Sequence, residues 1–149
     1  MATSFFKSFG ITSGTAALGI LVHSLATKVF TTTVFRLNLT ASSSIVPDAV
    51  REKVESSLIW KRWNAAQINE AEYVGTFLPI LLYLDVKGVD APLASGLALA
   101  GQILYFWPRV LVGHPQEGGI FPPPYVPGAL MRYMALGLLS KEIYSTTVK

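Results

Sequence analysis

The sequence predicts an all-α protein, an integral membrane four-helix bundle in a single domain. The chain has 149 residues, of which 51% are hydrophobic and only 14% charged. A soluble domain carries roughly 25% charged residues. The apolar residues gather in three long stretches and a shorter fourth, and most charges lie in residues 48–72, at the hinge 85–90 and in the C-terminal tail. The length is that of one domain.

The first predicted span covers residues 11–35. At about 1.5 Å per residue it is long enough for a hydrocarbon core of about 30 Å. It contains His23 and Lys28, and Arg36 follows at its C-terminal end, where a positive charge suits a helix. No persuasive cleavage site follows the apolar segment, so we interpret it as a retained helix and not as a signal peptide.

A polar connector, residues 37–61, follows the first span. From Pro47 onward its sequence is typical of a short interfacial helix. This connector carries slightly more basic residues than the loops and termini at the opposite ends of the spans. Because cytoplasmic loops are enriched in lysine and arginine, we predict that it faces the cytoplasm.

The other predicted spans are residues 62–86, 91–113 and 128–144. The second is polar in its first turns and apolar in its last. Asp90 is a suitable N-cap for the third, and Pro108, deep within it, predicts a kink or an early end. The fourth is short enough to reach only one membrane interface.

The composition also excludes several classes of function. The chain has no cysteine, which rules out disulfides and thiolate chemistry, and it has only two histidines. No spacing of metal ligands is present, so no metal site is expected. The net charge of +3 comes without a basic stripe interleaved with aromatic residues. The predicted partners are therefore membrane lipids and not nucleic acid.

Polar residues near the start of the second span are the strongest indication of a functional site, because such groups are costly inside a membrane. Four of them are spaced i, i+3, i+4 and i+7 and share one helix face, with two more on an adjacent stripe. The first set is Asn69, Glu72, Tyr73 and Thr76, and the second is Gln67 and Glu70.

Two interpretations of this polar face remain open. In the first, a carboxylate accepts a hydrogen bond from a ligand ammonium or a neighbouring arginine, and the amides orient the ligand. In the second, Glu72 pairs with an arginine only to clamp the helices together. The arginines available for that clamp are Arg36, Arg109 and Arg132.

Two arginines lie within or at the end of later spans. Arg109 either holds an anionic ligand between helices or extends toward the membrane surface along nearby aromatic residues. Arg132 falls inside the fourth span, where an unpaired arginine is costly, so we predict a carboxylate partner, either Glu70 or Glu72.

The remaining aromatic and histidine residues favour structural roles. We predict that His114 lies in a loop and that His23 is a buried, hydrogen-bonded group. Five aromatic residues resemble an interfacial belt. These are Trp60, Trp63, Tyr105, Phe106 and Trp107.

The segment Ala65-Ala-Gln67-Ile-Asn69-Glu70-Ala-Glu72-Tyr73, followed by Phe77-Leu-Pro79, resembles a known signature. It is the helix-two signature of the membrane-associated eicosanoid and glutathione metabolism family, which reads Arg-Ala-x-x-Asn-x-x-Glu before an apolar run. Residues 94–100 look like helix three of the microsomal glutathione transferases. The resemblance covers residues 60–115.

This resemblance implies a four-helix bundle assembled as a homotrimer in an intracellular membrane, that of the endoplasmic reticulum or an organelle. It implies glutathione bound between subunits on the cytosolic side. The residues on glutathione-contacting positions of the family would be Gln67, Asn69, Glu72 and Tyr73. The candidates for the catalytic cation would be Arg36, which matches a basic position of helix one, Arg109 and Arg132.

The chain also departs from the family pattern. Ala65 stands where the family has an arginine, and residues 121–128 contain no counterpart of the thiol-activating arginine. Arg132 lies a turn or more deeper. A glutathione enzyme needs a cation to raise the thiolate fraction and arginines to hold two carboxylates.

The sequence therefore favours a non-catalytic member of this fold, either a lipid-presenting protein or an accessory subunit of a larger membrane assembly. The alternative is a glutathione transferase or peroxidase acting on a lipophilic electrophile. A channel or transporter is disfavoured, because no inverted repeat or broken helix is evident.

Overall fold

The computed structural model describes residues 2–148, and this part of the chain contains helices and loops but no strand. The all-α prediction is confirmed. The first long run of helix is made of α2 (Ser13–Thr31), a π-helical turn η1 (Thr32–Arg36) and α3 (Leu37–Thr40). The other long helices are α5 (Leu58–Val86), α6 (Pro92–Leu111) and α7 (Val126–Thr147). The short ones are α1 (Ala2–Ser8), α4 (Asp48–Ser56) and η2 (Pro115–Glu117).

Three of the long helices extend beyond their predicted bounds. The first continues from α2 through α3 to Thr40, and its last turns satisfy their carbonyls with threonine hydroxyls, such as Thr40 Oγ1 donating to Arg36 O at 2.8 Å. α5 begins early because Ser57 caps it, accepting from Trp60 N. α7 has 22 residues, or about 33 Å, so it is not the short helix that the sequence predicts.

The turn between α5 and α6 and the end of α6 differ in detail from the prediction. Gly88 takes a left-handed φ of 66°, and its N–H donates to Asp85 O, which ends α5. Ala91, and not Asp90, is the N-cap of α6. Pro108 lies in the last turn, and the helix ends three residues later, at Leu111.

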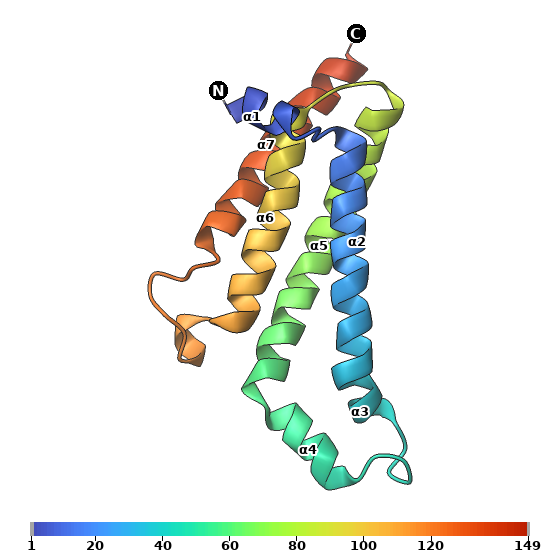
Figure 1. Cartoon of the computed structure of the whole chain (residues 1–149), viewed down its shortest axis with the longest axis vertical. Helices are drawn as coiled ribbons and strands as arrows, with labels where there is room; N and C mark the ends of the chain where they lie inside the picture. Colours follow the sequence, from blue (N-terminus) through green and yellow to red (C-terminus); the bar gives the residue numbers. More distant parts are fainter. Residues whose placement is uncertain (1, 149) are drawn as a thin grey trace.

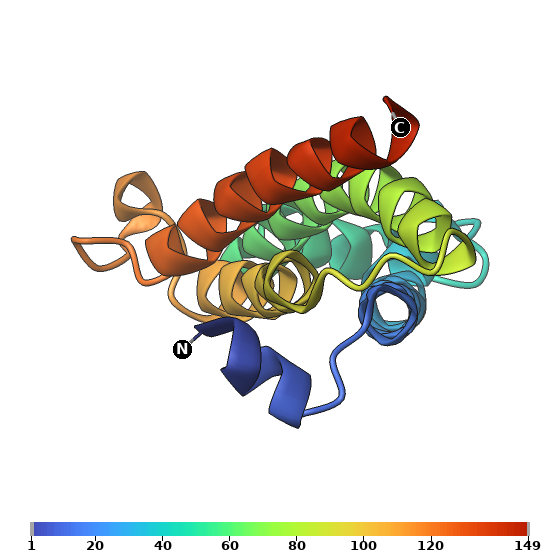
Figure 2. The same cartoon turned by 90° about the horizontal axis from the view of Figure 1, so that it is seen from above.

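The long helices lie side by side, and two separate apolar clusters hold them together (Figures 1 and 2). The larger cluster lies toward the end where both termini are found, and its fully buried members include Ile20, Phe77 and Leu81. The smaller one, toward the opposite end, is mostly aromatic and includes Trp63 and Phe106.

The contact between α6 and α7 is the most extensive helix pair in the molecule. It depends on a very close approach at Gly128, where an added Cβ would meet the backbone of Leu104 and Tyr105. Small residues allow such close approach between helix backbones. The fully buried Ala98 and Ala135 continue the small-residue packing of these two helices.

Among the described helices, the continuous helix Ser13–Thr40 is the one whose length and composition would allow it to cross a membrane. The other three long helices are not apolar enough for this by length and composition alone. The charged residues of α5 include Lys61, Arg62, Glu70 and Glu72.

The close packing at Gly128 predicts that alanine substitutions at two glycines of α7 change the unfolding free energy in opposite directions. Gly128→Ala should lower the unfolding free energy by about 1–3 kcal/mol, because the new methyl group has only backbone to displace. Gly137 is exposed and has no atom within 4 Å of an added Cβ. Gly137→Ala should therefore stabilise the helix by about 0.5–1 kcal/mol. Chemical denaturation in detergent measures both, and equal effects would contradict this packing.

Candidate functional site

A layer of polar side chains crosses the bundle between the two apolar clusters. We call it the polar layer. Each of the four long helices contributes to it, and most of its members are buried. It consists of His23 and Thr27 from α2, Asn69 and Glu70 from α5, Gln102 from α6 and Arg132 from α7.

Glu70 lies at the centre of this layer with its side chain only 1% exposed. Its Oε2 accepts from Thr27 Oγ1 at 2.8 Å. Its Oε1 lies 2.6 Å from Nδ1 of His23, a close contact that lacks the alignment of a hydrogen bond. A buried carboxylate is tolerated only when it is paired in this way. Glu70 is therefore held by α2. The prediction that His23 is a buried, hydrogen-bonded group is wrong in its second part: the side chain is 13% exposed and lies against Glu70, but neither ring nitrogen has a hydrogen-bond partner among the described residues.

Arg132 is 1% exposed and has no carboxylate within 4.0 Å among residues 2–148. Its guanidinium carbon lies 4.0 Å from the ring centre of Tyr105 and 4.4 Å from that of Tyr73. Its Nη1 donates to Asn69 Oδ1. The predicted carboxylate partner is wrong, because two electron-rich ring faces and one amide oxygen surround the cation instead.

The predicted ligand-contacting residues of α5 separate into three environments. Asn69 and Tyr73 lie together around Arg132. Gln67 is buried and accepts from Arg36 Nη2 at 3.4 Å. Glu72 is exposed on the outer side of α5. The helix face they share is wider than the strip that α7 covers, so only part of it becomes buried.

The alternative in which Glu72 clamps the bundle is also wrong. Among the described residues no cation lies within 4.0 Å of its carboxylate. The three arginines proposed as its partners bond elsewhere. Arg36 donates to Gln67, Arg109 to Glu117 and Arg132 to Asn69.

Arg109 forms a two-pronged ion pair with Glu117 in the connector after α6. Nη1 donates to Oε2 at 2.7 Å and Nη2 donates to Oε1 at 2.9 Å. These bonds lower the pKa of Glu117 from 4.5 to about 2. Arg62 of α5 adds a bond from Nη2 to Glu117 O at 3.1 Å. Arg109 therefore anchors a loop and is not free to hold an anion.

The loop around Glu117 is a short helical turn. His114 lies in this loop, as predicted, and its ring nitrogen Nδ1 accepts from Gln116 N at 3.2 Å. Its backbone N–H donates to Glu117 Oε2 at 3.2 Å. The sequence His-Pro-Gln-Glu has the spacing of a reciprocal cap, in which a side chain bonds to the backbone three residues away and the reverse. This spacing could have predicted a structural role for Glu117.

The predicted aromatic belt is only partly at the surface. Trp63 is 6% exposed and Phe106 is fully buried, and their rings lie 5.4 Å apart edge to face. Both belong to the smaller apolar cluster, because α5 and α6 meet there. Trp107 stays 39% exposed.

A small polar pocket lies between α2 and α5, with a volume of about 150 Å³. Two cations, Lys28 and Arg36, line it. It is the place near the predicted glutathione residues where an anionic group would find positive charge. The rest of its lining is Ser24, Gln67, Ile68, Glu70 and Ala71.

No known protein family, curated protein or solved structure matches this chain. Among residues 2–148 no group of three or more histidine and carboxylate side chains is placed to hold a metal ion.

The environment of Arg132 predicts that substitutions of Arg132 and Asn69 have strongly non-additive effects on the unfolding free energy. Asn69→Leu should lower the unfolding free energy by about 1–3 kcal/mol, because a buried guanidinium loses its acceptor. Adding Arg132→Met should recover most of that loss, since an apolar pair replaces a buried polar pair at little cost. Asn64→Leu, on the same helix and away from the layer, should change stability by less than about 0.5 kcal/mol. Additive effects of the Asn69 and Arg132 changes would contradict the contact.

The lowered pKa of Glu117 predicts that the unfolding free energy depends on pH. Its ion pair contributes stability above pH 4.5, and this contribution is lost as the pH falls toward about 2. Glu117→Gln should therefore lose less unfolding free energy than the parent across this window. Glu55→Gln, an exposed position on α4, should follow the parent. Thermal unfolding between these pH values measures the difference, and parallel curves for parent and Glu117→Gln would contradict the ion pair.

Proposed function

We propose that this chain is a four-span integral membrane protein of the endoplasmic reticulum or another organelle, with the fold of the membrane-associated eicosanoid and glutathione metabolism family. In this proposal it acts without catalysis, either presenting lipid or serving as an accessory subunit in a homotrimer or larger membrane assembly.

The observation that carries the membrane part is the outward direction of large apolar side chains on all four long helices. In Ser13–Thr40 only 22% of the apolar window is buried inside the molecule, whereas the core helix of a soluble protein is mostly buried. An apolar surface of this extent needs lipid or a partner to cover it. Its members include Leu18, Leu21, Val22 and Leu25 on α2, Leu82 on α5, Leu104 and Leu111 on α6, and Leu130 and Met134 on α7.

Glu72 supports an assembly of several chains. It lies at the middle of α5 and is exposed next to the apolar Ile68, which is 55% exposed. A carboxylate facing lipid at this depth is costly, and such residues normally face a partner or a polar cavity. A neighbouring subunit that covers this part of α5 would remove the cost.

The absence of catalysis is supported by how the candidate cations are used. Arg109 is bonded to Glu117, and Arg132 is enclosed by Tyr73 and Tyr105. Neither is available to stabilise a thiolate or to hold the two carboxylates of glutathione. Among residues 2–148 the Arg36 guanidinium makes one hydrogen bond, a long one of 3.4 Å to Gln67 Oε1.

The second candidate function is a glutathione transferase or peroxidase, and the polar pocket with Lys28 and Arg36 favours it. The pocket volume of about 150 Å³ is below the roughly 300–1,000 Å³ of small-molecule sites. A subunit contact would have to complete it. Turnover of glutathione that is lost in Arg36→Ala would support this function.

The membrane topology gives the direct test. Figure 1 shows the connectors after α3 and after α6 at one end of the bundle, and both termini and the α5–α6 turn at the other. Because the chain has no cysteine, single cysteines report without interference. In sealed vesicles, Ser43→Cys and Gln116→Cys should react with an impermeant maleimide from the cytosolic side. Ser8→Cys and Lys87→Cys should react only from the opposite side.

Leu82→Cys provides the matched control, since this exposed apolar position should be shielded by lipid and react slowly. Reaction of all four terminal and loop cysteines from one side would contradict the four-span proposal.

A further inference from the structure

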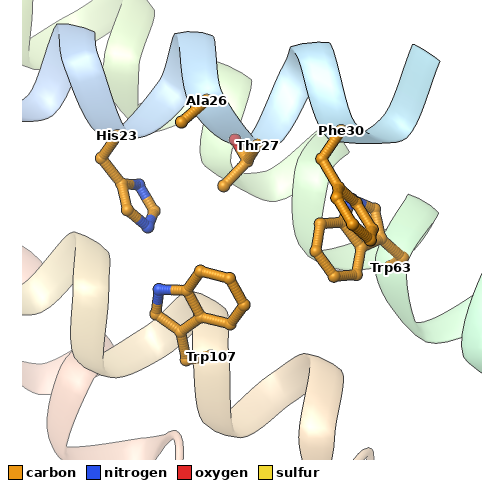
Figure 3. Close-up of a pocket in the computed structure, with 6 residues that line it drawn as sticks. All are labelled: His23, Ala26, Thr27, Phe30, Trp63 and Trp107. Atoms are coloured by element: carbon orange, nitrogen blue, oxygen red, sulfur yellow. The ribbon is translucent and has the colours of Figure 1, made fainter. Parts of the chain in front are cut away.

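A cavity of about 350 Å³ opens between α2 and α6, apart from the residues on which glutathione is predicted (Figure 3). Its volume lies within the range of small-molecule sites. Partly exposed Phe30 and Trp107, at 44% and 39%, stand at its opening toward the outer surface. Its lining consists of His23, Ala26, Thr27, Phe30, Trp63 and Trp107.

The cavity has flat aromatic walls. The rings of Trp63 and Trp107 lie 5.9 Å apart and nearly perpendicular, at 86°. Phe30 lies against Trp63 with ring centres 4.5 Å apart. Aromatic walls at such angles favour the faces and edges of another ring.

His23 places one polar atom in this apolar cavity. Figure 3 shows its ring extending from α2 toward Trp107. Glu70 Oε1 lies 2.6 Å from Nδ1. In a neutral imidazole the proton belongs on the nitrogen that faces a carboxylate, and Nε2 then offers a lone pair. Nε2 is buried and has no hydrogen-bond partner among the described residues. An acceptor left in this state costs free energy, which a ligand donor would recover.

We propose that this cavity binds a lipophilic phenol or hydroquinone that enters from the bilayer. The ligand ring packs against the walls formed by Trp63 and Trp107, and its hydroxyl donates a hydrogen bond to Nε2 of His23. An acyl chain would fill the same space but would leave Nε2 without a donor. The hydroxyl therefore distinguishes the proposed ligand from an ordinary lipid tail.

The test uses a brominated hexylphenol and its methyl ether, because bromine in contact with an indole quenches its fluorescence. The full-length protein is purified in detergent as the variant Trp60→Phe. The chain has three tryptophans, so this variant keeps two, Trp63 and Trp107, and both line the cavity. The phenol should quench saturably at a concentration about tenfold lower than the ether, since the ether cannot donate to the histidine.

Two further variants locate the binding. Ala26→Phe fills the cavity and should abolish saturable quenching. Leu18→Phe adds the same bulk to an exposed position of α2, 61% accessible and outside the cavity, and should leave binding unchanged. Equal affinity for phenol and ether, or saturable quenching that survives Ala26→Phe, would overturn the proposal. Both variants leave His23 and Glu70 in place, so the result does not depend on how the fold tolerates their loss.

Discussion

The burial of the Arg132 guanidinium between Tyr73 and Tyr105 constrains the arrangement of three helices at once. The cation comes from α7, one ring from α5 and the other from α6. A fully buried guanidinium requires partners in fixed places, because its desolvation is costly. The close approach at Gly128 brings α7 to the position where Arg132 meets both rings. Packing and electrostatics therefore support the same geometry.

The polar layer links the helices to one another and also adjoins the proposed ligand cavity. Glu70 joins α5 to α2 through Thr27 and His23, and Arg132 joins α5 to α7. Since these contacts join residues of different helices, they act first as links between helices. Several buried atoms of the layer still lack a hydrogen-bond partner among the described residues, including Nε and Nη2 of Arg132, Oε1 of Gln102 and both ring nitrogens of His23. The cavity is lined by His23. Structural polar contacts and a ligand site thus share one layer.

Helix positions could be predicted from the sequence because hydrophobic stretches and caps are local signals. Partners could not. Asn69, Glu72 and Tyr73 share a helix face by spacing alone, but only the position of α7 decides that Asn69 and Tyr73 are covered and Glu72 is not. Likewise, Arg109 pairs with Glu117 because the loop folds back, a long-range fact that no periodicity contains. Aromatic partners for Arg132 were missed because charge pairing was assumed.

Under the proposed function, the chain has the fold of the glutathione-metabolism family, while the arginines that could serve a glutathione site make other contacts. Thermal unfolding of the protein in lipid nanodiscs with millimolar glutathione tests this most directly, since a ligand at about 100 times its Kd adds about 2.7 kcal/mol. We predict no shift for the parent or for Glu72→Gln. A saturable shift in the parent that is lost in Glu72→Gln would contradict the claim and favour the glutathione enzyme.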